Sequence, residues 1–130
     1  SNEKSEGSEF DFYKKNQNRI KIFWAKDLPA TMPQLWAGKI NEILENLEEN
    51  VYLTFDVDAF DPSIMPSTGT PEPGGLYWYE VLKILKPVFE KKNVIAVDVV
   101  ELSPIKDILA PDFMIAKLIY KIIGYKFLKS

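Results

Sequence analysis

The sequence predicts an α/β fold in which a parallel sheet is built from strands and helices in the order β-α-β-α-β-α. Short apolar runs alternate along the chain with longer segments whose apolar residues follow helical spacing. The apolar runs are continuous, a pattern typical of strands that are covered on both faces. The helical segments are long enough to act as crossovers, which join parallel strands with a right-handed turn.

The first part of the chain is expected to contain a tail, a strand and a helix. Residues 1–17 are polar and charged, so we expect a polar tail there, followed by one domain at residues 18–130. A strand is predicted at Ile20–Ala25, and Pro29 and Pro33 mark a loop after it. Helical spacing begins beyond this loop, at Leu35, Trp36, Ile40, Ile43, Leu44 and Leu47.

The rest of the chain adds two strands, two helices and a long loop. Strands are predicted at Val51–Phe55 and Val94–Val100, and a helix between them is expected to end near Lys91. Pro111 suits the first turn of the last helix. The segment Asp56–Leu76 is rich in proline, and a loop of about twenty residues within a compact domain is usually functional. Three of its residues are expected at tight turns with positive φ: Gly69, Gly74 and Gly75.

Composition argues against several classes of protein. Of the 130 residues, 46% are hydrophobic and 13% aromatic, which is enough for a globular core. No apolar run approaches the ~18 residues that span a bilayer, and the polar N-terminus gives no sign of a signal peptide, so no membrane partner is expected. The net charge of −3 makes nucleic acid a poor partner. The absence of cysteine is compatible with a cytoplasmic location.

Acidic residues follow the two predicted strands at the ends where ligands bind in parallel sheets. Asp56 and Asp58 are two residues apart at the end of an extended segment, so their side chains are expected to leave the same face and converge on one cation. Asp61 follows in the next turn, and Glu101 follows the next strand. Because the chain has no histidine, any metal site within it is built from oxygen ligands, which suit Mg²⁺ or Mn²⁺.

Three segments carry a resemblance to a known family. Residues 56–63 read DVDAFDPS, residues 66–75 read PSTGTPEPGG, and residues 98–104 read DVVELSP. Together they resemble the signature segments of the ureohydrolases, the family of arginase, agmatinase and formiminoglutamase, whose members release urea from guanidino compounds at a two-manganese centre. The resemblance implies that this chain is the C-terminal half of a three-layer arginase-like fold and most like agmatinase, because Glu-Pro follows the TGTP segment.

The resemblance also implies a role for each acidic residue. Asp56 bridges two Mn²⁺ ions, and Asp58 binds one of them. Glu101 pairs with the guanidinium group of the substrate, and Thr70 lies in the same pocket, contacting the substrate or its ordered water. Two further acids are expected to hold the loop and the strand end, and not to bind metal: Asp61 and Asp98.

In the family, the remaining metal ligands are a histidine and an Asp-x-His-x-Asp segment, which lie before the segments matched here. This sequence contains neither of them. The resemblance therefore implies an incomplete site, a chain that is inactive alone, and a missing N-terminal half of the same polypeptide. It further implies a cationic guanidino substrate, with agmatine (giving putrescine and urea) preferred, and a trimer or hexamer in the parent protein. Arginase, guanidinobutyrase and formiminoglutamase activities remain open.

Two alternatives from other classes are also open. A DxD motif after a strand is compatible with a Mg²⁺-dependent phosphoryl-transfer domain, but such a site needs basic residues near the phosphates. Residues 56–75 contain no lysine or arginine. The other alternative is a structural fragment that retains the fold without catalysis.

Overall fold

The computed structural model describes residues 33–128 of the chain. Their order is α2 (Pro33–Glu45), β1 (Asn50–Asp56), a 3₁₀ helix η2 (Val57–Ala59), α3 (Trp78–Lys91), β2 (Asn93–Val100) and α4 (Ala110–Phe127). The polar tail at 1–17 and the strand predicted at Ile20–Ala25 lie outside the described residues. The expected helices and strands are otherwise present, except that α2 ends at Glu45 and leaves Leu47 in the turn before β1.

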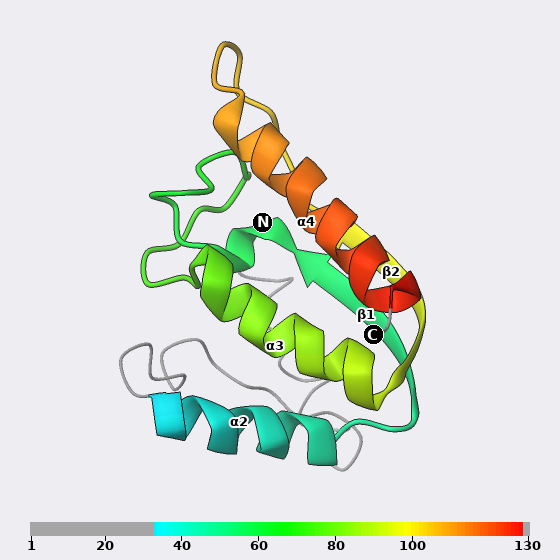
Figure 1. The fold of residues 1–130 in the computed structure, drawn as a ribbon. Coiled ribbons are helices and arrows are strands. Elements are labelled where there is room, and N and C mark those ends of the chain that lie inside the picture. The colour runs from blue at the N-terminus through cyan, green and yellow to red at the C-terminus, as the bar shows by residue number, and fades with distance from the viewer. Residues whose placement is uncertain (1–32, 129–130) are drawn as a thin grey trace, which may run out of the picture.

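The two strands are parallel neighbours, which confirms the predicted α/β architecture (Figure 1). Their register shifts after Val51: Val51 pairs with Val94, but Tyr52 pairs with Ala96, so Ile95 is an extra residue in β2. Such a bulge changes which side chains share a face. It places Val94 and the pair Leu53–Val97 on one face, and Tyr52, Thr54 and Asp56 with Ala96, Asp98 and Val100 on the other.

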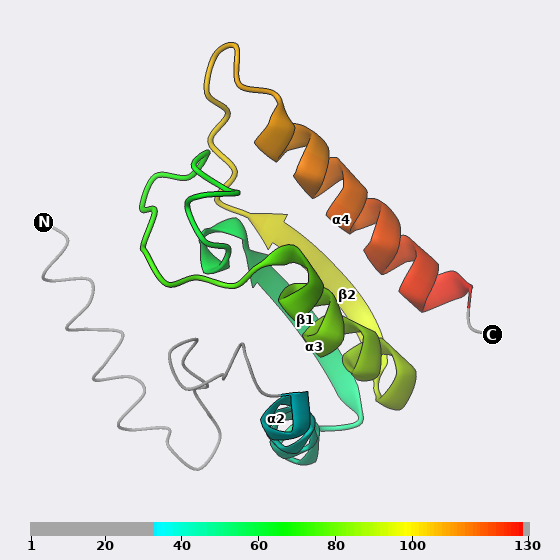
Figure 2. The ribbon, with the colours of Figure 1, turned by 60° about the vertical axis from the view of Figure 1, so that its left-hand side comes forward.

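Helices α3 and α4 lie over the first of these faces, as both views of the ribbon show (Figures 1 and 2), and α2 packs along α3. The shared core includes Phe55 from β1, Val94 from β2, Leu85 and Phe89 from α3, and Leu118 from α4. Apolar residues at helical spacing form these contacts because that spacing keeps them on one side of each helix.

The second face of the sheet differs from the prediction. Its apolar composition indicated cover on both sides, yet the side chain of Tyr52 is 58% exposed and Thr54 is exposed as well. Among residues 33–128, no helix buries this face. An apolar strand composition therefore does not by itself show that both faces are covered within residues 33–128.

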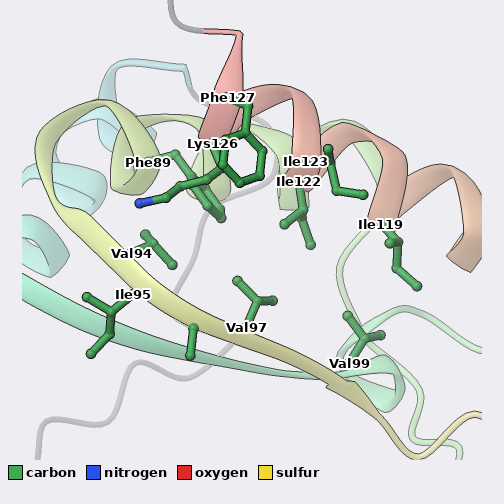
Figure 3. Close-up of a pocket in the computed structure, with 11 residues that line it drawn as sticks. Phe89, Val94, Ile95, Val97, Val99, Ile119, Ile122, Ile123, Lys126 and Phe127 are labelled. Carbon is green, nitrogen blue, oxygen red and sulfur yellow. The ribbon is translucent and has the colours of Figure 1, made fainter.

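An apolar groove with a volume of about 420 Å³ lies between β2 and α4 (Figure 3). It is lined chiefly by aliphatic and aromatic side chains, among them Val94, Val97, Val99, Ile119, Ile123 and Phe127. No acidic residue lines it, so it is separate from the acids that follow β1 and β2. Within the described part of the chain, no helix combines the length and the hydropathy that a bilayer-crossing segment needs.

The loop between η2 and α3 is closed at its neck by backbone hydrogen bonds. The N–H of Asp61 donates to the carbonyl of Leu76 at 2.9 Å, and the N–H of Leu76 donates to the carbonyl of Ala59 at 2.8 Å. Phe60 and Leu76 thereby form an isolated parallel bridge. The long loop is therefore a closed structure anchored on the core, because Phe60 is 1% exposed.

Gly75 is required at this neck for a reason that differs from the prediction. Of the three glycines predicted at tight turns, only Gly74 has a positive φ, of 82°. A Cβ atom on Gly75 would lie 2.5 Å from the backbone nitrogen of Asp61, whereas one on Gly69 would meet nothing within 4 Å.

We expect Gly75→Ala to lower the free energy of unfolding by about 1–3 kcal/mol. The new Cβ atom would clash with the backbone of Asp61, and the two segments cannot move apart without opening the Phe60–Leu76 bridge. Urea denaturation of the chain measures this loss. Gly69→Ala is the matched control, expected to be neutral or to stabilise by up to about 1 kcal/mol. Equal losses from both substitutions would contradict this account of the neck.

Candidate metal and substrate site

Asp56 is the last residue of β1 and lies opposite Val100, the last residue of β2. Its Oδ1 accepts a hydrogen bond from the backbone N–H of Asp58 at 3.0 Å, so Asp56 caps the η2 turn. The prediction of an extended Asp56–Asp58 segment is therefore wrong. The chain turns immediately after β1, because the side chain of Asp56 satisfies the first free N–H of the 3₁₀ helix.

The carboxylates of Asp56 and Asp58 nevertheless converge. Burial raises the pKa of Asp56, and the nearby side chain and charge of Asp58 raise it further, against the opposing effect of the Asp58 N–H. The charge of Glu101 also raises the pKa of Asp56. Two further acids thus act on Asp56 at the adjoining ends of β1 and β2, where repulsion favours either its protonation or a cation.

Thr70 is brought to this site by the long loop. Its Oγ1 donates a hydrogen bond to Oδ2 of Asp58 at 3.0 Å, and its N–H donates to Oγ1 of Thr68 at 3.1 Å. The loop therefore folds back until its tip touches the residues that follow β1. Thr70 and Asp58 are twelve positions apart in the sequence, and the closed neck of the loop makes this contact possible.

Glu101 follows β2 directly and is exposed. Its φ is 70°, in the left-handed region, which residues other than glycine adopt infrequently and at an energetic cost. Such strain is common at functional sites, where the surrounding structure holds a side chain in a required direction. Glu101 thus lies just beyond the end of β2, near enough to Asp56 for its charge to raise the pKa of that residue.

Asp61 is engaged within the loop. Its Oδ1 accepts hydrogen bonds from the N–H and the hydroxyl of Ser63, at 2.9 and 2.6 Å, and its Oδ2 accepts from the N–H of Gly74 at 3.2 Å. These donors, with those of Ser63 contributing most, lower the pKa of Asp61. Its carboxylate thus ties the start of the loop to its end.

Asp98 lies further back on β2, on the same face as Asp56. Its Oδ2 accepts a hydrogen bond from the hydroxyl of Tyr52 at 2.5 Å. This hydrogen bond and the charge of Asp98 raise the pKa of Tyr52. The other oxygen, Oδ1, is buried and has no partner among the described residues.

Sequence reasoning missed two residues near the site. Tyr52 meets Asp98 only because of the bulge at Ile95, which no sequence pattern indicates. Ser67 is fully buried, and its carbonyl accepts a hydrogen bond from the N–H of Ser103 at 2.8 Å, joining the loop to the segment after β2. In the sequence, the only feature that could have indicated this burial is the small side chain of Ser67 between two proline-containing turns.

The described residues contain no group of three or more side chains that could hold a metal ion together. Asp56 and Asp58 supply a pair of carboxylates, and such hard oxygen ligands fit Mn²⁺ or Mg²⁺. The chemistry of these ligands is therefore that of part of a divalent-cation site. Glu101 adds a third acidic group without completing such a cluster.

Removing one of the repelling charges is expected to stabilise the chain. Asp56→Asn keeps an oxygen for the Asp58 N–H and removes the repulsion, so we expect the free energy of unfolding at pH 7 to rise by about 0.5 kcal/mol. Since the pKa of Asp56 is raised in the folded state, its ionisation destabilises the fold at neutral pH. The advantage of the variant should therefore shrink as the pH falls through that raised pKa. Urea denaturation across this range measures it, and an advantage that grows toward acidic pH would contradict the repulsion.

Comparisons with known proteins bear on this arrangement. The chain matches the model of the arginase family over residues 2–124. An N(1)-aminopropylagmatine ureohydrolase from Synechocystis sp. is 44% identical over 110 residues, which are 84% of this chain and 34% of that protein. An agmatinase from Pyrococcus horikoshii is 39% identical over 83 residues, which are 64% of this chain and 29% of that protein.

The same likeness holds for solved structures. The crystal structure of Helicobacter pylori arginase is similar with a TM-score of 0.73 and 25% sequence identity, over 92% of this chain and 40% of that one. The predicted arginase-like fold is thereby confirmed. The chain spans about a third of the length of the curated relatives it matches.

Proposed function

This chain belongs to the arginase family, and from that premise we propose that it is the C-terminal half of a dimanganese ureohydrolase that converts agmatine to putrescine and urea. The observation that carries the proposal is the placement of Asp56, Asp58 and Glu101 at the adjoining ends of the parallel strands β1 and β2, with Thr70 hydrogen-bonded to Asp58. Two acids suited to a divalent cation and a third suited to a guanidinium group are among the elements that urea release requires.

Asp56 and Asp58 would hold the metal ions, with Asp56 shared between them. Bound Mn²⁺ would supply a water activated for attack at neutral pH. The N–H of Asp58 would help to orient Asp56 for this role, because it donates a hydrogen bond to Oδ1 of Asp56. Asp61 would stabilise the loop, since it accepts hydrogen bonds from Ser63 and Gly74. Asp98 would stabilise the end of the strand, since it accepts a hydrogen bond from Tyr52.

Glu101 would bind the guanidinium group of the substrate through charge-assisted hydrogen bonds. It is exposed, has a strained backbone, and follows the strand beside the one that ends at Asp56. Thr70 would face the same space, where its hydroxyl contacts the substrate or a water molecule while it orients Asp58. The acidic surroundings would attract a cation and hold it next to the metal-binding acids.

We infer that the isolated chain is inactive. Two Mn²⁺ ions carry four positive charges, of which Asp56 and Asp58 offset two, and the described residues contain no complete metal cluster. The rest of the parent would supply the missing ligands and cover the open face around Tyr52. It would also cover the apolar residues of α4, such as Phe127, which is 74% exposed. We further propose a cytoplasmic homo-oligomer, a trimer or hexamer, for the parent.

A second substrate is favoured by a specific observation. The relative from Synechocystis sp. that is 44% identical is named for N(1)-aminopropylagmatine. Release of urea from that compound would leave the aminopropyl derivative of putrescine. Both substrates present the same guanidinium group to Glu101 and differ only in the length of the cationic tail.

Urea release by the complete polypeptide tests the proposal. With Mn²⁺ present, we expect urea from agmatine or N(1)-aminopropylagmatine, less from arginine, and none from the 130-residue chain alone. The ratio of kcat/KM for agmatine to that for N(1)-aminopropylagmatine shows which length of cationic tail the enzyme prefers. The absence of urea from all guanidino compounds, with the protein folded and loaded with metal, would contradict the proposed function.

A further inference from the structure

A backbone hydrogen bond joins the long loop to the segment that follows β2. The N–H of Ser103 donates to the carbonyl of Ser67 at 2.8 Å. Among residues 33–128, Ser67 is the only polar residue that is buried, whereas Ser103 is exposed. Met65, two positions before Ser67, belongs to the hydrophobic core. Because close packing leaves buried residues little room to move, the carbonyl of Ser67 is a fixed acceptor for the segment after β2.

Each side of this hydrogen bond leads to a residue of the proposed substrate site. On the side of the loop, the residue after Ser67 is Thr68, whose Oγ1 accepts a hydrogen bond from the N–H of Thr70 at 3.1 Å. On the side of the strand, Glu101 lies two positions before Ser103 and has a φ of 70°. A short stretch of chain therefore connects the Ser67–Ser103 hydrogen bond to both Thr70 and Glu101.

The geometry points to Ser67 as a positioning residue whose backbone carbonyl holds Glu101 and Thr70 at a fixed separation. A strained backbone such as that of Glu101 persists only where the surrounding structure restrains it. In the described segment 102–108, the only other backbone hydrogen bond joins Ile108 to Ile105 within the segment itself. The bond to Ser67 is thus the one that restrains the chain just after Glu101.

The separation of Glu101 and Thr70 matters for substrate binding. A guanidinium group presents its N–H donors in a rigid plane, so its partners have to be correctly spaced. Asp56, by contrast, belongs to β1 and accepts from the N–H of Asp58, and neither feature involves Ser67. Loss of the Ser67 contact should therefore weaken substrate binding more than metal binding. This inference rests on the proposed function in taking Glu101 and Thr70 as the guanidinium site.

Ser103→Pro in the complete polypeptide removes the donor, and Ser103→Ala is the matched variant that keeps it. Ser103 is exposed and its φ is negative, so proline does not disturb the core. We expect Ser103→Pro to raise KM for agmatine about tenfold or more and to change kcat by less than about threefold, with KM restored in Ser103→Ala. A purely structural role would lower kcat through the fraction of folded enzyme and leave KM unchanged. That result, or an equal rise of KM in both variants, would overturn the inference.

Amide hydrogen exchange of the complete polypeptide tests the same connection without substrate. In Ser103→Pro the N–H of Thr70 should exchange at least about threefold faster, because the loop is released from the segment after β2. The N–H of Lys92, bonded at the end of α3, is the reference and should not change. Ser67→Val enlarges a fully buried side chain, should have the same effect, and does not depend on the proline variant folding. Unchanged exchange at Thr70 would overturn the inference, whereas faster exchange without any urea release by the unmodified protein would contradict only the proposed function.

Discussion

Glu101→Gln in the complete polypeptide is expected to reduce kcat/KM for agmatine by about 100-fold to 1,000-fold. Glutamine has the shape of glutamate but cannot pair its charge with a guanidinium group, and breaking such a pair costs about 2–5 kcal/mol. Steady-state urea production measures the loss. Glu90→Gln on α3 is a matched control, because Glu90 is exposed and its partner is Lys86 on the same helix. A Glu101→Gln enzyme with near-normal kcat/KM would show that Glu101 does not bind the guanidinium group.

The backbone of Glu101 gives this prediction a second part. Its φ of 70° is strained for glutamate but not for glycine. Glu101→Gly should therefore abolish the guanidinium contact and raise the free energy of unfolding by about 1 kcal/mol. An inactive but more stable variant would identify the strain as serving function, whereas a less stable one would show that the Glu101 side chain supports the fold.

Phe60→Ala has the largest expected effect on stability, a loss of about 3–5 kcal/mol. Phe60 is 1% exposed, stacks on Trp78 with ring centroids 6.4 Å apart, and contacts Phe55 at 5.4 Å. It also lies at the neck of the long loop, so its loss should release Thr70 from Asp58. A typical domain is stable by about 5–15 kcal/mol, so the variant is expected to be partly unfolded.

Urea denaturation followed by tryptophan fluorescence measures this loss, because Trp78 stacks on Phe60. Tyr79→Ala is the control, because Tyr79 follows Trp78 in the first turn of α3 but is 75% exposed. Its removal should change stability by less than about 0.5 kcal/mol. Similar losses from the two variants would contradict the role of Phe60 as the anchor of the loop.

The described fold could be predicted from sequence because its elements depend on local patterns. Helical spacing marked α3, and Pro111 marked the start of α4 within a residue. The bulge at Ile95 could not be predicted, since it depends on how β1 and β2 align, and it decides that Asp98 meets Tyr52. The exposure of the second sheet face could not be predicted either, because the apolar strand runs are compatible with one covered face or two.

The site was predictable in composition but not in local geometry. The segment from Asp56 to Asp58 was expected to be extended, whereas the structure has a 3₁₀ turn there that Asp56 caps. The position of Glu101 after β2 followed from the parallel topology, whereas its positive φ had no signal in the sequence. The hydrogen bond from Thr70 to Asp58 requires the closed loop, which local patterns do not encode.

Calorimetric titration with Mn²⁺ tests most directly whether this chain carries only the acidic part of a two-metal site. The complete polypeptide should bind two ions tightly, and Asp56→Asn should weaken both if that residue is shared between them as proposed. The 130-residue chain should bind manganese only weakly. Two tight sites on that chain alone, or none on the complete polypeptide, would contradict the account.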